Sequence, residues 1–292
     1  NCIENILKSI FFRFVYLHLI FNFMKKIFLT VFILVLFQNG FSQKNILWKG
    51  YFSYNEIKSI SESSTKMVAA SENALFTKNL STGEISTTNT IDGLSGETIS
   101  TVYYSPSLNK TVIGYQNGLV IVVNEKDKSV YKAIGIIQKQ IPDNVKKINS
   151  FYEHNGILYI SCLFGIVQFN LNTNEFGDTY FLGSTINDYQ EVLQTTVLSN
   201  EIYAVTRNNG IKKGLLTNPN LNDYSQWQVF DSGYWNGIAV INNQLVASGT
   251  NNILYKFNGN VSSSFFVTNK TTLNFKVYNN NLIVTNADNV YV

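Results

Sequence analysis

Pairs of short apolar stretches recur along the chain from about residue 43 to its end. In each pair a strand-like run ends in small or polar residues, a tight turn rich in Asn or Gly follows, and a second apolar run begins. Apolar runs joined by such a turn are typical of β-hairpins. Six hairpins are predicted, over residues 67–77, 111–124, 158–170, 202–215, 245–258 and 282–292.

The predicted hairpins are regularly spaced. The residues that precede their second strands are Asn73, Asn117, Phe164, Asn209, Asn252 and Asn289, at intervals of 44, 47, 45, 43 and 37 residues. Repeats of this length made of short strands are typical of propeller blades, because a single blade cannot bury both of its faces without neighbours. Helical repeats would carry apolar residues three and four positions apart, and these segments do not.

Two further strands accompany each hairpin. One precedes it, as in 99–105, 148–155, 193–200 and 275–280, and one follows it after a polar turn, as in 124–133 and 170–176. Residues 43–292 are therefore predicted to form an all-β propeller of four-stranded blades. The sixth repeat stops within a strand at Val292, so we expect about six blades that are incomplete, with at least one more downstream and seven in the closed ring.

An export signal precedes the repeats. Met24 and two lysines are followed by an apolar run over 27–37, and the small residues Gly40 and Ser42 stand where a signal peptidase would cut. Residues 24–42 are predicted to be a signal peptide, with an uncleaved membrane anchor as the alternative. Residues 1–23 are interpreted as an over-extended gene start. No cysteine follows the predicted cut, so a lipid anchor is not expected there.

The charge of the mature part argues against nucleic acid as a partner. From residue 43 onward, 18 basic residues balance 18 acidic residues, and Arg207 is the single arginine among them. Arginine is the side chain that grips phosphates in bidentate fashion, and nucleic-acid-binding domains usually carry a basic surface.

Few residues in the mature part suit catalysis. Cys162 is its only cysteine, so no internal disulfide is possible, and we expect a buried apolar residue there, with a reactive thiol as the alternative. His154 is its only histidine and is expected to be an exposed turn residue. One histidine and one cysteine cannot form a zinc site or a Ser/His/Asp triad. No catalytic, cofactor-binding or metal-binding residue is predicted.

Two loops resemble ligand-binding loops only faintly. Residues 172–178 alternate oxygen-bearing side chains around a Gly, but calcium loops carry more carboxylates, so a blade turn is expected. Residues 92–96 are Gly-rich but lack the Lys and the following helix of a phosphate loop, which favours an inter-blade connection.

Paired lysines and clustered aromatics are the remaining candidates for binding. The pairs Lys146–Lys147 and Lys212–Lys213 are interpreted either as solvated turn residues or as contacts for an acidic glycan or lipopolysaccharide. Aromatic clusters are expected to be buried between blades, with a sugar- or protein-binding platform as the alternative. Their members are Trp48, Tyr51, Phe52, Tyr54, Trp227, Tyr234 and Trp235.

Part of the chain resembles a known family. The segments that carry the resemblance are 48–57, 69–76, 92–95, 99–100 and 114–119, and it is strongest from residue 48 to about 183. They are similar to the amino-terminal propeller of the PorZ family of the type IX secretion system of Bacteroidetes. The resemblance implies two successive propellers and a sorting domain at the outer surface. It also implies an attachment complex with the sortase PorU and with PorV and PorQ, in which anionic lipopolysaccharide is handed to the sortase. No binding residue of the family is carried over.

Two other functions are considered. The unit over 99–120 also resembles the periplasmic sensor propellers of two-component regulators, which need a membrane helix and a kinase. A propeller lyase or glycosidase would need clustered histidines or paired carboxylates at the ring, and the sequence is short of both. The expected function is thus a noncatalytic scaffold and binding subunit.

Overall fold

The computed structural model describes residues 13, 16–30, 32, 56–185 and 187–292, and the chain divides into two compact units, Asn1–Tyr51 and Phe52–Val292. In the first unit, residues 16–30 are helical with exposed side chains. No helix in the described residues is long and apolar enough to cross a membrane. The predicted signal peptide over 24–42 extends beyond the described residues and stays a prediction.

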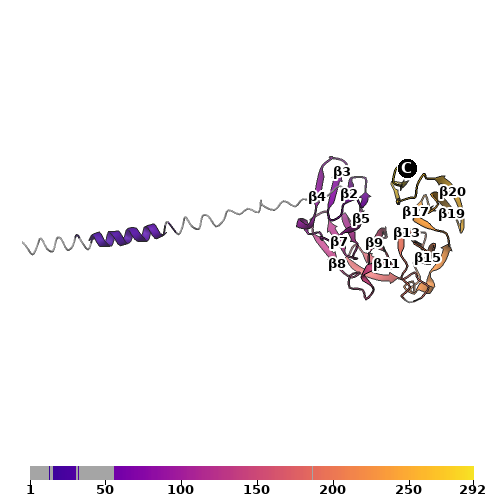
Figure 1. The fold of residues 1–292 in the computed structure, drawn as a ribbon, viewed down its shortest axis with the longest axis horizontal. Helices are drawn as coiled ribbons and strands as arrows, with labels where there is room; N and C mark the ends of the chain where they lie inside the picture. The colour runs from indigo at the N-terminus through magenta and orange to yellow at the C-terminus, as the bar shows by residue number, and fades with distance from the viewer. Residues whose placement is uncertain (1–12, 14–15, 31, 33–55, 186) are drawn as a thin grey trace, which may run out of the picture. The chain divides into compact units, whose positions relative to one another are not determined.

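The second unit is a ring of six blades (Figure 1), each an antiparallel sheet in up-and-down order. Blade 1 holds β1 (Ser59–Glu62), β2 (Lys66–Ala70), β3 (Leu75–Asn79) and β4 (Ile85–Thr88). Blade 2 holds β5 (Ile99–Ser105), β6 (Lys110–Tyr115), β7 (Val120–Asn124) and β8 (Val130–Ala133). Blade 3 holds β9 (Ile148–His154), β10 (Ile157–Cys162), β11 (Gly165–Asn170) and β12 (Glu175–Tyr180).

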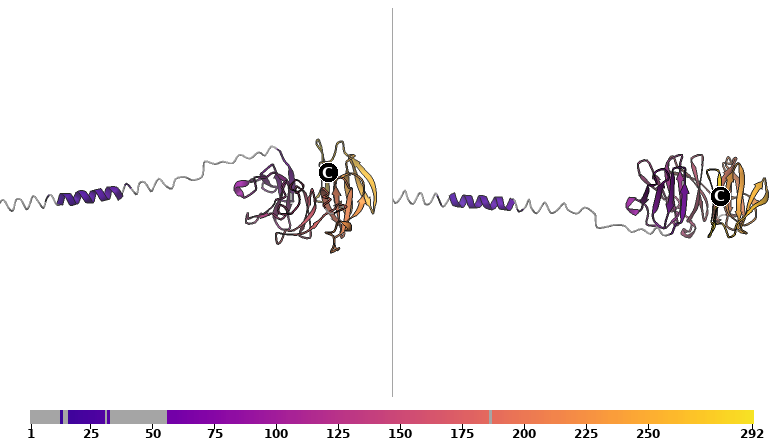
Figure 2. Two further views of the ribbon diagram at one scale, coloured as in Figure 1. Left: turned by 60° about the horizontal axis from the view of Figure 1, so that its bottom comes forward. Right: turned by 90° about the horizontal axis from the view of Figure 1, so that it is seen from above.

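The remaining blades follow the same order around the ring, and Figure 2 shows them from two further sides. Blade 4 holds β13 (Val192–Leu198), β14 (Glu201–Thr206), β15 (Ile211–Leu215) and β16 (Gln228–Asp231). Blade 5 holds β17 (Trp235–Ile241), β18 (Gln244–Gly249), β19 (Ile253–Asn258) and β20 (Val261–Val267). Blade 6 has three strands, β21 (Asn274–Tyr278), β22 (Asn281–Thr285) and β23 (Val290–Tyr291).

The six predicted hairpins are the second and third strands of the six blades, so the repeat and the all-β propeller are confirmed. Tight turns join the strands where the sequence offers Asn and Gly. Asn155 and Gly156, for example, both have positive φ (52° and 77°) between β9 and β10. Two successive residues of positive φ give the type I′ turn, whose twist matches that of the flanking strands.

Apolar side chains hold neighbouring blades together. Between blades 2 and 3, alternate residues of the middle strands form one buried cluster that includes Val112, Val120, Leu158, Ile160 and Phe169. Each such side chain contributes about 1.5–3 kcal/mol when it is removed from water. The fourth strands are more polar and exposed, as in β4, where three of four residues are exposed. The core therefore lies between the blades, as a stack of sheets requires.

Polar contacts add to this packing at the joint between blades 1 and 2. Lys66 at the start of β2 reaches across to the Glu125 carboxylate of blade 2 (3.0 Å), which also accepts hydrogen bonds from Lys128 (2.6 Å) and Thr111 (2.6 Å). At the equivalent position of blade 2, Lys110 donates to the Asn174 side chain of blade 3 (3.1 Å). The same strand position thus links successive blades.

Lowering the pH is expected to weaken the joint between blades 1 and 2. Burial raises the pKa of Glu125, but the hydrogen bonds from Lys128, Thr111 and Lys66 outweigh it and hold that pKa below the ordinary value of 4.5. A lowered pKa means that the stabilisation is present above about pH 4.5 and is lost as the pH falls through the folded-state value. Urea unfolding at pH 7 and pH 3 should show a loss of stability, of which Glu125→Gln removes about 2 kcal/mol. Glu84→Gln, at an exposed site, is the control and should leave the loss unchanged.

The structure contains six blades and does not show the seventh blade that the sequence predicts. Blade 6 lies next to blade 1, because Lys276 of β21 donates to Glu62 (2.5 Å) and to the Ile60 carbonyl (3.4 Å) of β1. The four-stranded architecture is confirmed for blades 1 to 5, and a seventh blade stays a prediction.

Candidate functional site

The first strands of all six blades surround a central channel of about 310 Å³. These inner strands are β1, β5, β9, β13, β17 and β21. Every blade contributes residues to this common space, so the channel is the leading candidate for a ligand site. Among the described residues that line it, Lys276 is the cation and Glu62 and Glu153 are the acids.

The two acids occupy equivalent positions of their blades. Glu62 stands opposite Met67 and Glu153 opposite Leu158, each the second residue of the next strand. Glu62 forms an ion pair with Lys276 of blade 6. Glu153 instead accepts hydrogen bonds from the Tyr103 hydroxyl of blade 2 (3.1 Å) and from Ser107 (3.0 Å). The glutamate at this position thus links blade 1 to blade 6 through an ion pair. In blade 3 it links to blade 2 through hydrogen bonds from neutral hydroxyls.

Tyr103 remains a neutral donor in this contact. Burial raises the pKa of its phenol far above the ordinary value of 10.0, and the Glu153 charge raises it further. Among the described residues, no histidine or cysteine hydrogen-bonds to the Tyr103 hydroxyl or to the Glu153 carboxylate. Because Tyr103 and Glu153 both line the channel, they can contact a group bound there.

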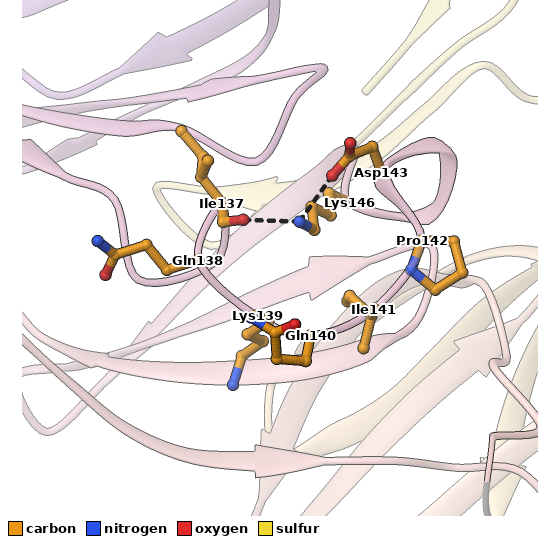
Figure 3. A pocket seen from close by; sticks show the side chains of 8 residues that line it. All are labelled: Ile137, Gln138, Lys139, Gln140, Ile141, Pro142, Asp143 and Lys146. Carbon is orange, nitrogen blue, oxygen red and sulfur yellow. Dashed lines mark hydrogen bonds and ion pairs between the residues drawn. The ribbon is translucent and has the colours of Figure 1, made fainter.

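A second hollow of about 670 Å³ lies within the loop between β8 and β9 (Figure 3). The buried Lys146 ammonium at its centre donates to the Ile137 carbonyl (2.6 Å) and to Asp143 (2.8 Å). Lys139 is half-buried on the same loop, and burial lowers its pKa. Lys146 thus holds the loop closed and is already satisfied by protein oxygens.

The predicted lysine pairs do not form basic patches. Lys146 and Lys212 are both buried, and Lys212 donates to the Leu182 carbonyl. Lys213 pairs with Glu201 (2.8 Å). Of these four lysines, Lys147 is the one that is exposed and forms no ion pair with the described residues. The interpretation of both pairs as solvated turn residues is wrong for their first members.

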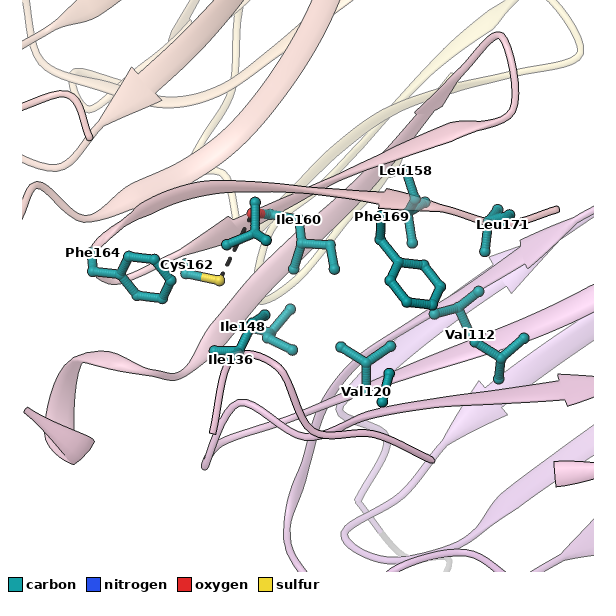
Figure 4. Packing of buried hydrophobic residues seen from close by; sticks show 13 residues of the cluster. Val112, Val120, Ile136, Ile148, Leu158, Ile160, Cys162, Phe164, Phe169 and Leu171 are labelled. Carbon is teal, nitrogen blue, oxygen red and sulfur yellow. Dashed lines mark hydrogen bonds between the residues drawn. The ribbon is translucent and has the colours of Figure 1, made fainter. Parts of the chain in front are cut away.

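Cys162 is fully buried between blades 2 and 3 (Figure 4). It packs among Ile148, Ile160 and Phe164, and its thiol lies 3.7 Å from the Ile160 carbonyl. Burial raises the pKa of the thiol far above the ordinary value of 9.0. The expectation of an inert apolar residue is confirmed, since a reactive cysteine needs a lowered pKa and access to solvent.

The turns behave mainly as structural elements. His154 ends β9 at a half-buried position, so it is less exposed than expected, and its ring contacts the Asn155 side chain (3.0 Å). In the 172–178 segment, residues 172–174 form a blade turn, in which the Asn170 side chain accepts from the backbone of Asn172 (2.9 Å), and residues 175–178 belong to β12. Residues 92–96 connect blades 1 and 2, after a 3-10 helix capped by Asn89. No group of three metal-ligating side chains occurs in the described residues.

Burial is the main outcome for the aromatic cluster of blades 4 and 5. Trp227 donates to the Leu221 carbonyl (3.0 Å) and Trp235 to Asp231 (3.0 Å), and both indoles are buried. Tyr234 between them is 67% exposed. The cluster over Trp48, Tyr51, Phe52 and Tyr54 lies outside the described residues.

Sequence reasoning missed the residues that line the channel. Glu62 and Lys276 stand 214 residues apart, and neither belongs to a motif. A signal was nevertheless present, because Glu62 and Glu153 each precede a predicted hairpin by five positions, and Lys276 precedes one by six. Counting back from each hairpin would have placed Glu62 and Glu153 at one level of the inner strands.

Comparisons with known proteins identify the propeller. Residues 67–228 match the family described as the type IX secretion system PorZ N-terminal β-propeller domain. No curated protein matches the chain. The structure is similar to that of PorZ, described as an essential bacterial surface component of the type IX secretion system of Porphyromonas gingivalis. The TM-score is 0.72 at 16% identity, over 84% of this chain and 32% of that chain.

Two other propellers show the same fold at lower similarity. The extracellular domain of a putative one-component system from B. thetaiotaomicron has a TM-score of 0.62 at 12% identity, over 83% of this chain and 34% of that chain. BamB from Moraxella catarrhalis has a TM-score of 0.55 at 12% identity, over 85% of this chain and 76% of that chain. The chain thus spans about a third of the length of the solved PorZ. Because the family match covers more than half of the sequence and runs from the first blade into the fourth, the chain belongs to the family of PorZ N-terminal β-propeller domains.

Proposed function

We propose that the protein is a noncatalytic surface scaffold of the type IX secretion system. The observation that carries this proposal is the family match over residues 67–228. The likeness to a solved surface component of that system supports the same fold assignment. A ring of rigid blades with contacts between successive blades suits a scaffold, because such a ring presents loops on a stable frame.

The proposal includes export and assembly. Residues 24–42 direct the chain out of the cytoplasm as a signal peptide, with 1–23 as an upstream over-extension. At the cell surface the protein joins an attachment complex with the sortase PorU and with PorV and PorQ, and it reaches the outer membrane through these partners. The proposal of these partners rests on the family membership.

Presentation of anionic lipopolysaccharide to the sortase is the finer part of the proposal. The lysine pairs give it no support, because Lys146, Lys212 and Lys213 are occupied within the protein. The channel also carries more acid than base among its described lining residues. An anionic glycan would therefore bind elsewhere on the full-length protein or through exposed lysines such as Lys147.

A sensor propeller is the second candidate. The likeness to the extracellular domain of a putative one-component system favours it, but that likeness shows the fold alone. A sensor would leave secretion intact when deleted and would alter transcription instead.

Deletion of the gene from its own bacterium tests the proposal. We expect the deletion strain to release type IX cargo into the medium instead of retaining it at the surface, as measured by immunoblots of cell and medium fractions. A plasmid copy should restore retention, and a copy without residues 24–42 should not. Normal cargo retention in the deletion strain would contradict the secretion role.

A further inference from the structure

The Glu153 carboxylate lacks the cation that its counterpart has. Glu62 at the equivalent position is neutralised by Lys276, which stands opposite Ile283, the third residue of β22. Tyr103 stands opposite Val112, the third residue of β6, and so fills the position that Lys276 fills in blade 6. In the described parts of the chain no ion pair includes Glu153. Its two oxygens are held in place by neutral donors, and its charge is uncompensated.

The channel around this carboxylate favours positive charge. Its described lining carries one uncompensated negative charge after Glu62 and Lys276 are paired. Tyr103, Tyr152 and Tyr278 also line it. The electron-rich faces of aromatic rings attract ammonium and guanidinium groups, more strongly where water is excluded. Anionic groups are disfavoured by the same field.

Unsatisfied hydroxyls line the same space. Thr196 is 1% exposed, and its hydroxyl has no hydrogen-bond partner among the described residues. The same is true of the Ser150 hydroxyl. Buried hydroxyls without partners cost free energy, so in native proteins they usually meet water or a ligand. Hydroxyl oxygens accept hydrogen bonds from the several N–H groups of a guanidinium or ammonium.

From these three observations we infer that the central channel is a binding site for a guanidinium or ammonium group, held by the Glu153 carboxylate among the channel tyrosines. The channel volume of about 310 Å³ suits one basic side chain with a short flanking segment. An arginine or lysine in a loop of a partner polypeptide and a free polyamine share this chemistry. The inference rests on the channel alone and is independent of the secretion role.

Isothermal titration of the full chain with short peptides tests the site. The probe is the capped peptide acetyl-Gly-Arg-Gly-amide, and its neutral control carries citrulline in place of Arg. We expect saturable binding of the arginine peptide, with at least tenfold weaker binding of the citrulline peptide. Glu153→Gln should weaken binding of the arginine peptide about tenfold or more, because the peptide loses one charged hydrogen-bonding partner. Glu175→Gln, at an exposed site on the fourth strand of the same blade, should change nothing.

A second variant separates binding from folding. Tyr103→Lys places an ammonium where blade 6 has Lys276, so it should neutralise Glu153, abolish peptide binding and leave the far-ultraviolet circular dichroism unchanged. Spermidine that binds with the same dependence on Glu153 would assign the site to free polyamines within the same chemistry. Equal binding of both peptides, full binding by Glu153→Gln, or no binding by either peptide or spermidine would overturn the inference.

Discussion

Replacing Gly165 by Ala is expected to lower the free energy of unfolding by about 4 kcal/mol. Gly165 begins β11 with a φ of 146°, which L side chains rarely adopt, and an added Cβ would lie 2.2 Å from the Tyr180 carbonyl oxygen. That oxygen belongs to the last residue of β12 and cannot move without disturbing the pairing of β11 with β12. Backbone strain and overlap therefore act together.

Urea unfolding followed by tyrosine and tryptophan fluorescence measures this effect. Gly210, which precedes β15 with a φ of 69°, meets the Asp231 carbonyl at 2.0 Å in the same way, so Gly210→Ala should cost a similar amount. Gly259 is the matched control, since its φ is 57° but nothing lies within 4 Å of an added Cβ. Gly259→Ala should cost only about 1–2 kcal/mol, the strain of a left-handed residue. If Gly165→Ala lowered the free energy of unfolding no more than Gly259→Ala does, this would contradict the close approach of β11 and β12.

The hairpins could be predicted because their signal is local. Asn and Gly adopt the positive φ that the turns require, as at Asn155 and Gly156. Apolar alternation along each strand determines which face is buried. Strand periodicity also indicates that only one residue of an adjacent pair such as Lys212 and Lys213 can face solvent. Applied to that pair, it would have corrected the expectation that both are solvated.

The channel contacts could not be predicted from any single segment. Glu62 meets Lys276 only because six blades bring the first and last inner strands together, and the number of blades is a property of the whole ring. Tyr103 and Glu153 similarly come from adjacent blades. Such contacts depend on the order and register of all inner strands, which turn chemistry does not specify.

A cross-link between positions 62 and 276 tests the six-bladed ring. The variant Glu62→Cys/Lys276→Cys, made with Cys2→Ser, is treated with a short bismaleimide, and Cys162 stays unreactive because it is buried. Lys276 contacts β1 directly, so we expect one intramolecular cross-link, detected by mass spectrometry of tryptic peptides.

The link should stabilise the protein more than any substitution considered above destabilises it. It closes a loop of more than 200 residues, and chain entropy predicts a gain of about 5 kcal/mol relative to the unlinked variant. The melting temperature should rise by about 10 °C or more. Glu84→Cys/Glu175→Cys is the control pair and should not cross-link within one chain, since Glu84 directly precedes β4 of blade 1 and Glu175 begins β12 of blade 3. If no cross-link formed, blades 6 and 1 would be too far apart for the predicted contact. A seventh blade between them would have this effect.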